Sequence, residues 1–381
     1  MERDMKRRII QYTTVVLAFL AGMIFMTYMT RMGNRDMTGD MAQAQLPVVH
    51  AEQDGVLYNE MHGYVEDMDG ASMRDSVIGV SEDHKVGLAL EKYNAQIKSV
   101  SYEVRSLDMS RLIEGGDDPQ AEDDGKYLHI SLTLKDLLTQ GEEYLLVLKV
   151  QTEDQDLVRF YSILTYLGTN HVQDCVDFAQ RFHEMTLTGD SDGVLNYLEQ
   201  DGSMDGKNLG YINIHSRSGP VTWGDMQVEQ IGDPSLRFTE LESDITALTM
   251  EYQVTNTETS EQYQVREAYR LRYTSTRIYL LAYERWTDKI LEPGRQLVED
   301  GKLSFGIQSS EPVYMKNTEE NVVGFVEQGQ LWSYDYGQNR LSLVYGFTDG
   351  QDGRADWKEH DFRLLKVDDT GSMDFLLYGY M

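Results

Sequence analysis

Residues 9–29 form a run of 21 residues without a charged side chain. An α-helix of this length rises about 31 Å, which matches the hydrocarbon core of a bilayer. The basic residues Lys6, Arg7 and Arg8 directly precede the run, whereas only Arg31 and Arg35 follow it closely. Because a basic excess keeps a short flank in the cytoplasm, we predict a single transmembrane helix. Residues 1–8 would then be cytoplasmic, and the C-terminal bulk of the chain would lie outside the membrane.

A cleaved signal peptide is the competing interpretation of this run. Signal peptides normally have a shorter apolar region, and a small-x-small cleavage site follows it at once. Here the run ends in the bulky residues Phe25, Met26 and Tyr28, and an Ala-Gln-Ala pattern occurs only at 42–44. We therefore expect an uncleaved anchor at 9–29, followed by a short tether over 30–45.

The rest of the chain is strongly acidic. Its formal net charge is −30 and its pI is about 4.5, although residues 1–31 carry a basic excess. A surface this negative repels nucleic acid phosphates and anionic lipid headgroups, so we expect no nucleic acid partner. Such a surface favours solubility and can attract cations or basic partners. The hydrophobic content of 41% is that of a folded chain.

Cys175 is the only cysteine in the sequence, which excludes an intramolecular disulfide and a cysteine-based metal site. It shares a helical apolar face with Val172, Val176, Ala179 and Phe182. This spacing predicts a buried thiol rather than a nucleophile. An exported domain without disulfides is typical of a bacterial surface that has no oxidising periplasm.

Residues 46–168 alternate between apolar and polar side chains, as half-buried antiparallel strands do. The apolar rows are Val100, Tyr102 and Val104; Leu128, Ile130, Leu132 and Leu134; Leu146, Leu148 and Val150; and Val158, Phe160 and Leu164. Turn-rich gaps between these rows predict a β-sandwich-like domain. We expect the acidic, glycine-rich stretch 114–125 to be an exposed loop.

Residues 169–290 combine helices with long strands. Asn170 could cap a first helix, and a shorter helix is expected at 194–199. One strand would turn Tyr263, Val265, Tyr269, Leu271 and Tyr273 inward, and the next would turn Ile278, Leu280, Ala282 and Trp286 inward. Residues 274–277 would form the turn between them. The pattern predicts an α+β domain. In shape it resembles the cone of helix and curved sheet shared with nuclear transport factor 2, without any signature residue.

Residues 295–381 contain short strand-like runs at 322–327, 331–334, 341–347, 362–367 and 375–380. The spacing of these runs, rich in glycine and aromatic residues, resembles the start of a β-propeller. Trp332, Tyr334, Tyr336, Tyr345 and Trp357 could stack on sugars, but packing within a blade is the simpler interpretation. One or two blades cannot close a ring, so we expect this sequence to be the front part of a longer protein. The fold class is therefore mainly β with an α+β middle domain.

Asp349, Asp352 and Asp356 cluster in a glycine-rich stretch and are the candidate metal ligands. Hard carboxylate oxygens at close spacing suit calcium. The stretch does not match the EF-hand pattern, so an ordinary loop between strands is the favoured interpretation. A weaker candidate is the acidic set Asp117, Asp118, Glu122, Asp123 and Asp124, which is typical of a solvated charge run. We expect no other cofactor.

The sequence contains no recognisable catalytic motif. The eight histidines are scattered, and none has the H-x-x-x-H spacing of a helical metal site; they are His50, His62, His84, His129, His171, His183, His215 and His360. Serine-hydrolase elbows, Walker loops and dinucleotide-binding motifs are also missing. Paired carboxylates for glycosidic cleavage remain open. Arg266, Arg270 and Arg272 could face an anionic ligand, although a solvated sheet face balanced by acids is the simpler interpretation.

The whole arrangement resembles uncharacterised membrane-anchored surface proteins of Gram-positive anaerobes, a resemblance that implies no catalytic residue. We expect a non-enzymatic extracytoplasmic protein. It would bind a protein or envelope polymer, or modulate a neighbouring sensor or transport complex. Two alternatives stay open: an envelope carbohydrate-active enzyme whose site lies in a propeller region beyond this chain, and a purely structural envelope protein.

Overall fold

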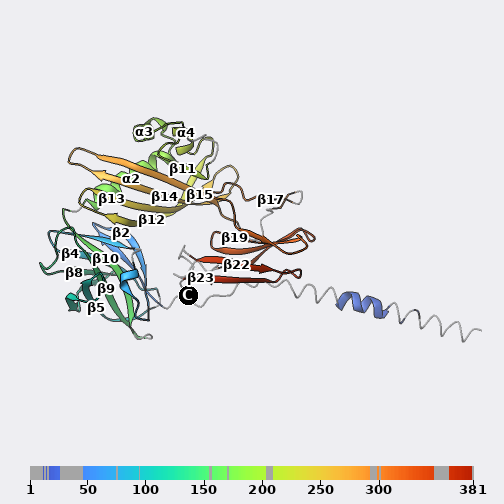
Figure 1. Ribbon diagram of the computed structural model, residues 1–381, viewed down its shortest axis with the longest axis horizontal. Helices are drawn as coiled ribbons and strands as arrows, with labels where there is room; N and C mark the ends of the chain where they lie inside the picture. The colour runs from blue at the N-terminus through green and yellow to red at the C-terminus, as the bar shows by residue number, and fades with distance from the viewer. Residues whose placement is uncertain are drawn as a thin grey trace, which may run out of the picture. The chain divides into compact units, whose positions relative to one another are not determined.

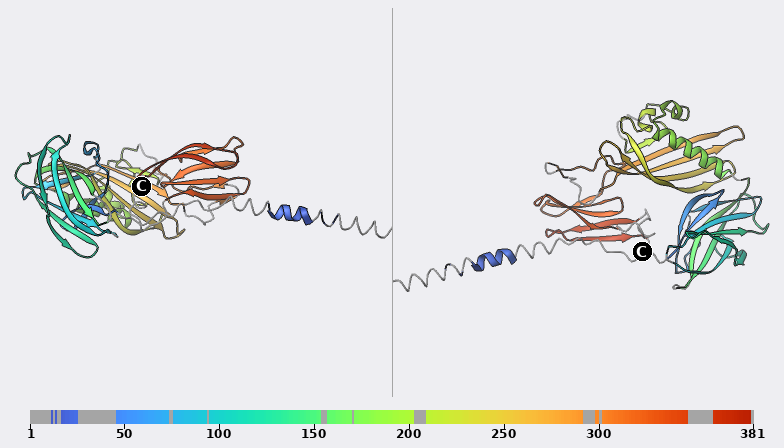
Figure 2. Two further views of the ribbon diagram at one scale, coloured as in Figure 1. Left: turned by 90° about the horizontal axis from the view of Figure 1, so that it is seen from below. Right: turned by 180° about the vertical axis from the view of Figure 1, so that it is seen from behind.

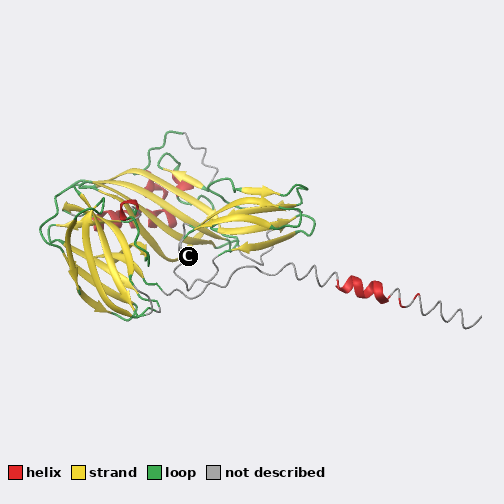
Figure 3. Cartoon of the chain, turned by 60° about the horizontal axis from the view of Figure 1, so that its bottom comes forward, coloured by secondary structure: helices red, strands yellow, loops and turns green. Residues whose placement is uncertain are grey.

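The computed structural model describes residues 12, 14, 17–25, 46–73, 76–93, 95–153, 157–169, 171–202, 209–291, 298–299, 302–346 and 360–379. Residues 17–25 are helical, but no helix within these ranges is long and apolar enough to cross a membrane. Ten of the 21 residues of the predicted anchor at 9–29 lie outside the described residues. The fold is mainly β, as predicted, with several separate sheets (Figure 3).

Two five-stranded sheets form the first part of the described chain (Figure 1). One sheet has the order β2 (Val56–His62), β1 (Val48–Gln53), β4 (Lys85–Glu91), β8 (Tyr127–Thr133) and β7 (Gln120–Asp123). The other has the order β3 (Val77–Ser81), β10 (Val158–Gly168), β9 (Glu143–Thr152), β5 (Ile97–Ser106) and β6 (Leu112–Asp117). All neighbours are antiparallel except β3 and β10. The predicted apolar rows on β5, β8, β9 and β10 contribute to one shared core.

The stretch 114–125 is mostly exposed, as predicted, but it is not a loop, because most of it belongs to β6 and β7. Position 116 of β6 requires glycine, because the ring of Tyr102 occupies the space that a side chain would need. An added Cβ would be 2.7 Å from Tyr102 Cε1. Glu114 is buried and accepts hydrogen bonds from the Tyr102 hydroxyl and the Lys135 backbone amide. Contacts with residues distant in sequence therefore explain why Gly116 and Glu114 fit into a strand.

A third five-stranded sheet, the curved sheet, follows. It is antiparallel and has the order β11 (Tyr211–Asn213), β15 (Ile278–Lys289), β14 (Gln262–Tyr273), β13 (Ile245–Asn256) and β12 (Val228–Leu241). Helix α2 (Val172–Leu187) lies across one face of this sheet (Figure 2). It buries the predicted apolar face, including Cys175 and Phe182. Short helices α3 (Ser191–Leu195) and α4 (Ser218–Val221) follow α2, and α3 begins before the predicted range 194–199. The predicted cap Asn170 lies outside the described residues.

A β-bulge changes which residues of β15 face the core. The pairing of β14 with β15 shifts between Arg270, opposite Ala282, and Leu271, opposite Leu280, so β15 contains one extra residue. One inserted residue reverses the in–out alternation beyond it. The predicted inward positions of Ala282 and Trp286 are therefore wrong. Tyr283, Arg285, Thr287 and Lys289 are buried there instead.

Asn59 joins the first part of the chain to the curved sheet. It is fully buried and has a left-handed backbone, with φ of +53°, at a bulge in β2. Its side-chain Nδ2 donates to the Val77 carbonyl at 2.7 Å, and its Oδ1 accepts from the Phe238 amide at 2.6 Å. Tyr58 packs edge-on against Phe238 beside these bonds. The first part of the chain and the curved sheet both contribute to one continuous core.

A separate compact unit contains the described residues 314–346 and 360–379. It has a four-stranded antiparallel meander of β18 (Tyr314–Lys316), β19 (Val322–Glu327), β20 (Gln330–Asp335) and β21 (Arg340–Tyr345). It also has a hairpin of β22 (Asp361–Val367) and β23 (Met373–Tyr378). Leu331, Phe362 and Leu364 form its core. The described strands of this unit form no closed ring. A short pair, β16 (Val298–Glu299) and β17 (Lys302–Leu303), precedes the unit in sequence.

Candidate functional site

The structure assigns no metal site to the predicted residues. Asp349, Asp352 and Asp356 all lie outside the described residues. Within the described ranges, no group of three or more histidine, cysteine or acidic side chains is arranged to hold a metal ion. The weaker acidic set is divided between the end of β6, the β6–β7 corner, β7 and the turn that follows β7.

The predicted arginine row lies on the outer face of the curved sheet, and each member has a partner. Arg270 makes two hydrogen bonds to the Glu240 carboxylate, at 2.9 and 3.0 Å. Arg266 stacks over the Trp286 ring and Arg272 over Tyr279. One arginine of the row therefore pairs with a neighbouring acid, and the other two stack on aromatic rings.

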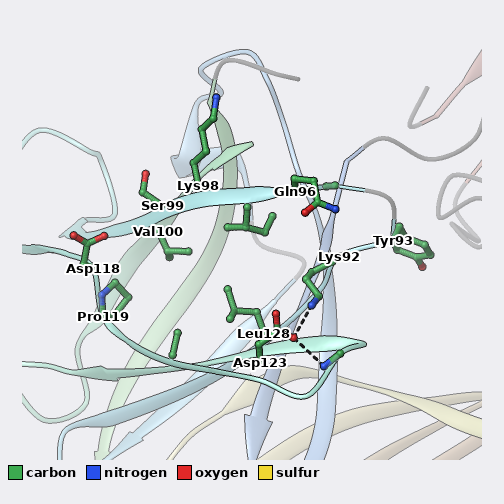
Figure 4. A pocket seen from close by; sticks show the side chains of 14 residues that line it. Lys92, Tyr93, Gln96, Lys98, Ser99, Val100, Asp118, Pro119, Asp123 and Leu128 are labelled. Carbon is green, nitrogen blue, oxygen red and sulfur yellow. Dashed lines mark hydrogen bonds and ion pairs between the residues drawn. The ribbon is translucent and has the colours of Figure 1, made fainter. Parts of the chain in front are cut away.

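A groove of about 420 Å³ opens in the first part of the chain, between β5 on one side and β7 and β8 on the other (Figure 4). Asp118 and Pro119 lie at one end of the view and Tyr93 at the other. Its apolar lining comes from Ala95, Ile97, Val100, Ala121 and Leu128. Its polar lining comes from Lys92, Gln96, Lys98, Ser99, Asp118 and Asp123. The groove therefore has a mixed lining in which polar surface exceeds apolar surface.

The groove forms because β6 and β7 belong to different sheets. β6 pairs with β5 only as far as Ser101, which lies opposite Asp117. The chain then turns at Asp118 and Pro119 and enters the other sheet as β7. Residues 97–100 of β5 continue beyond this point. Ile97, Ser99 and Val100 pair with β9 on their other side, and the register shifts at Lys98. β5 and β7 therefore diverge from this corner, and the groove lies between them.

The charges of the groove differ in how they are used. The Lys92 ammonium donates to Asp123 Oδ1 at 2.6 Å, and this bond is the main reason that the pKa of Asp123 is lowered. By contrast, the side chains of Lys98 and Asp118 make no ion pair or hydrogen bond with any described residue. The Lys98 side chain points away from β7 and β8 (Figure 4), so Asp118, at one end of the groove, is the charged group that remains available to a ligand.

A second polar cluster lies in the interior between α2 and the curved sheet. The Glu267 carboxylate is fully buried and accepts hydrogen bonds from the hydroxyls of Tyr269, at 2.6 Å, and Tyr283, at 2.8 Å. It also faces His183 Nδ1 at 3.1 Å. The other ring nitrogen, Nε2, faces Gln230 Oε1 at 2.7 Å. The Gln230 amide nitrogen donates to the Gly232 carbonyl, which fixes the orientation of the amide.

The hydrogen bonds of His183 indicate the imidazolium form. Both ring nitrogens face acceptors, and only a doubly protonated ring can donate to both. Burial opposes this charge, but the hydrogen bond and charge of Glu267 outweigh burial and raise the pKa of His183. Burial likewise opposes ionisation of Glu267, yet His183 and Tyr269 keep the pKa of Glu267 below its usual value. The two side chains therefore form a buried ion pair.

Arg285 extends this cluster on the neighbouring strand, directly opposite Glu267. Its guanidinium is fully buried, donates to the carbonyls of Val221 and Pro220, and stacks over the Trp223 ring. His183 is only 6% exposed and Glu267 is not exposed at all. Because substrate cannot reach these groups in this conformation, the cluster acts on stability and its pH dependence.

Sequence analysis did not identify either the groove or the cluster. Glu267 did leave a signal, because it occupies the missing position in the inward row of Tyr263, Val265, Tyr269 and Leu271. An acid in an apolar row requires a buried partner. The groove left no such signal, because its walls come from segments that meet only in the folded chain.

Comparisons with known proteins give no family assignment. No protein-family model matches the chain, and no curated protein is significantly similar to it. Function is therefore inferred from the groove, the buried cluster and the predicted anchor.

Proposed function

We propose that this chain is a membrane-anchored extracytoplasmic binding protein whose ligand occupies the groove between β5 and β7. The observation that carries the proposal is the open groove itself, with its mixed apolar and polar lining and with Asp118 at one end, whose side chain makes no ion pair or hydrogen bond with any described residue. The uncharged run at 9–29 would anchor the chain, with residues 1–8 in the cytoplasm. The ligand would be a protein or an envelope polymer, and the bound chain would modulate a neighbouring sensor or transport complex.

The groove supports binding better than catalysis. Hydrolysis of a glycosidic bond normally requires one carboxylic acid with a raised pKa facing a second carboxylate. Asp123 has the opposite property, since Lys92 lowers its pKa. The only described acid that histidine and two tyrosines hold in place is Glu267, which is fully buried. A carbohydrate-active enzyme would need a site in a propeller region beyond this chain, as considered above.

The proposed modules fit this role. The paired sheets at 46–168 would act as a sandwich-type binding module, and the region at 169–290 as a supporting cone of the nuclear transport factor 2 shape. The meander at 314–345 has the four antiparallel strands of one propeller blade. We propose that it is the first blade of a β-propeller region.

Binding assays with groove variants test the proposal. The full chain, in detergent micelles, would be screened against immobilised peptides and cell-envelope glycan fragments. Asp118→Asn should weaken capture of the ligand found, whereas the matched control Asp136→Asn, at an exposed aspartate outside the groove, should retain it. Equal capture by both variants would contradict the proposal.

Cell fractionation tests the placement. We expect the intact chain in the membrane fraction, with its acidic region accessible to protease added outside the cell. Recovery of the intact chain from the cytosol would contradict the anchor and the extracytoplasmic role together.

A further inference from the structure

We infer that residues 64–73 form a redox-sensitive strap, which a peroxide opens by oxidising the methionines that hold it. The strap belongs to the connection between β2 and β3 and lies over the outer face of the sheet that contains β9 and β10. The inference goes beyond ligand binding and does not depend on the groove between β5 and β7.

The strap covers an apolar set that lies apart from the main core. Leu145 and Val147 alternate on β9 with residues that face the main core, so these two side chains face the opposite side of the sheet. Tyr161 lies opposite Val147 on β10 and completes the set. On a bare sheet these side chains would be exposed, yet Leu145 is 0%, Val147 3% and Tyr161 6% exposed. The strap and its neighbours therefore cover this face.

Methionines are three of the four described, partly buried side chains that pack against this set. Met68 and Met73 belong to the strap, Met109 belongs to the turn between β5 and β6, and the fourth is Tyr64. Each of the three methionines is partly exposed, so water-soluble oxidants have access to this layer. Methionine fills gaps inside many protein cores, where burial protects it. Here it forms the outer layer of a small separate cluster instead.

Outside this methionine layer, the strap is attached mainly at its beginning. Tyr64 and Arg159 exchange two backbone hydrogen bonds, at 2.8 and 2.9 Å, and the Arg159 guanidinium donates to the Val65 carbonyl. Beyond these residues, no described part of the strap pairs with a strand. The Met68 amide donates to the Tyr161 hydroxyl at 3.0 Å, so this bond depends on the covered set itself. The later part of the strap therefore relies on its contacts with the set and with the methionine layer.

Gly70 shows how closely the strap meets Met109. The Gly70 amide donates to Met109 Sδ at 3.0 Å. A Cβ added to Gly70 would be 2.3 Å from Leu145 Cδ2 and 3.1 Å from the same sulfur, so this contact has no spare space. An oxygen bound to the sulfur on the side of Gly70 would therefore displace the strap.

The reaction is a two-electron oxygen transfer. The thioether sulfur attacks one oxygen of hydrogen peroxide, the O–O bond breaks, and that oxygen remains on the sulfur as a sulfoxide while the other leaves as water. The sulfur is oxidised and the peroxide is reduced, with no other reactant. A sulfoxide is polar and chiral, so it packs poorly against Leu145 and Val147. Oxidation thus weakens the layer that holds the strap and exposes the apolar set.

Treatment of the full chain with hydrogen peroxide, in detergent micelles, tests the inference. Peptide mass spectrometry would locate sulfoxides at Met68, Met73 and Met109, and hydrogen–deuterium exchange would follow the amides of residues 66–72. Oxidation of these methionines should speed exchange there about tenfold or more and leave exchange at β13 unchanged. Reduction of the sulfoxides by methionine sulfoxide reductases, with a thiol reductant, should restore slow exchange.

Leucine variants separate these methionines from general oxidative damage. Leucine has a similar volume and no oxidisable sulfur. A triple variant with Met68→Leu, Met73→Leu and Met109→Leu should keep slow exchange in peroxide. The matched control Met226→Leu, at a partly buried methionine outside the strap, should respond like the original chain. If the triple variant does not fold, reversal by the reductases in the original chain still decides the question.

Three outcomes would overturn the inference. The first is a sulfoxide at all three methionines with unchanged exchange at residues 66–72. The second is the absence of sulfoxides there under conditions that oxidise Met226, because the layer would then be protected. The third is equal acceleration in the triple variant and the original chain, which would assign the opening to other oxidised residues.

Discussion

Replacement of Glu267 by glutamine should destabilise the fold strongly. The carboxylate accepts hydrogen bonds from two tyrosine hydroxyls and faces His183, and it is fully buried. Removal of one partner from a buried ion pair typically costs about 3–5 kcal/mol, because the other charge is left uncompensated. For a unit of this size, such a loss corresponds to a fall in Tm of roughly 6–20 °C.

The effect should depend on pH in a defined direction. The raised pKa of His183 contributes stability that is complete below the ordinary histidine value of 6.5 and is lost as pH rises through the folded-state pKa. The lowered pKa of Glu267 contributes stability that is complete above the ordinary value of 4.5 and is lost as pH falls through the folded-state pKa. The pair therefore contributes most between these two ordinary values.

Urea unfolding at pH 5.5 and at pH 8.5, followed by tryptophan fluorescence, measures both effects. Glu267→Gln should lose more free energy of unfolding at pH 5.5 than at pH 8.5, because the stability that the raised pKa of His183 contributes declines as pH rises above the ordinary histidine value. The matched control Glu240→Gln removes the exposed partner of Arg270 and should change stability little at either pH. A loss for Glu267→Gln below about 1 kcal/mol, or one equal at both pH values, would refute the buried ion pair.

Three further predictions concern packing. Asn59→Ala should lose roughly 2–5 kcal/mol of unfolding free energy in urea titrations. The change removes two buried hydrogen bonds and places alanine at a left-handed backbone position that asparagine tolerates better. An unfolding free energy equal to that of the original chain would contradict the structural role of Asn59. Cys175 should react with a maleimide only after denaturation, because burial raises the pKa of its thiol and covers it, and rapid labelling of the native chain would count against this. Gly116→Ala should lower Tm because its Cβ meets the Tyr102 ring, whereas Gly219→Ala, with open space around it, should not.

The sequence predicts local structure well where one face of an element is apolar throughout. The rows on β5 and β8–β10 confirm this, as does the buried face of α2, because alternation with period two or 3.6 follows directly from backbone geometry. The turn at 274–277 is also confirmed between β14 and β15. In the later unit, β19 has the predicted bounds, while β18 was not predicted.

Features that depend on long-range contacts could not be predicted in this way. A single extra residue in β15 moved Trp286 to the outer face and Arg285 to the core, and no local pattern marks that bulge. Asn59 reads as an ordinary polar strand residue until Val77 and Phe238 are placed on either side of it. The groove depends on β6 and β7 joining different sheets, which is a property of topology rather than of composition.

Hydrogen–deuterium exchange of the full chain, with and without the ligand found in the binding screen, tests the central claim most directly. If the groove is the ligand site, bound ligand should slow exchange at residues 97–100 of β5 and 120–123 of β7, and leave exchange at β14 and β15 unchanged. Protection confined to other strands, with those two stretches exchanging as fast as in the free chain, would contradict it.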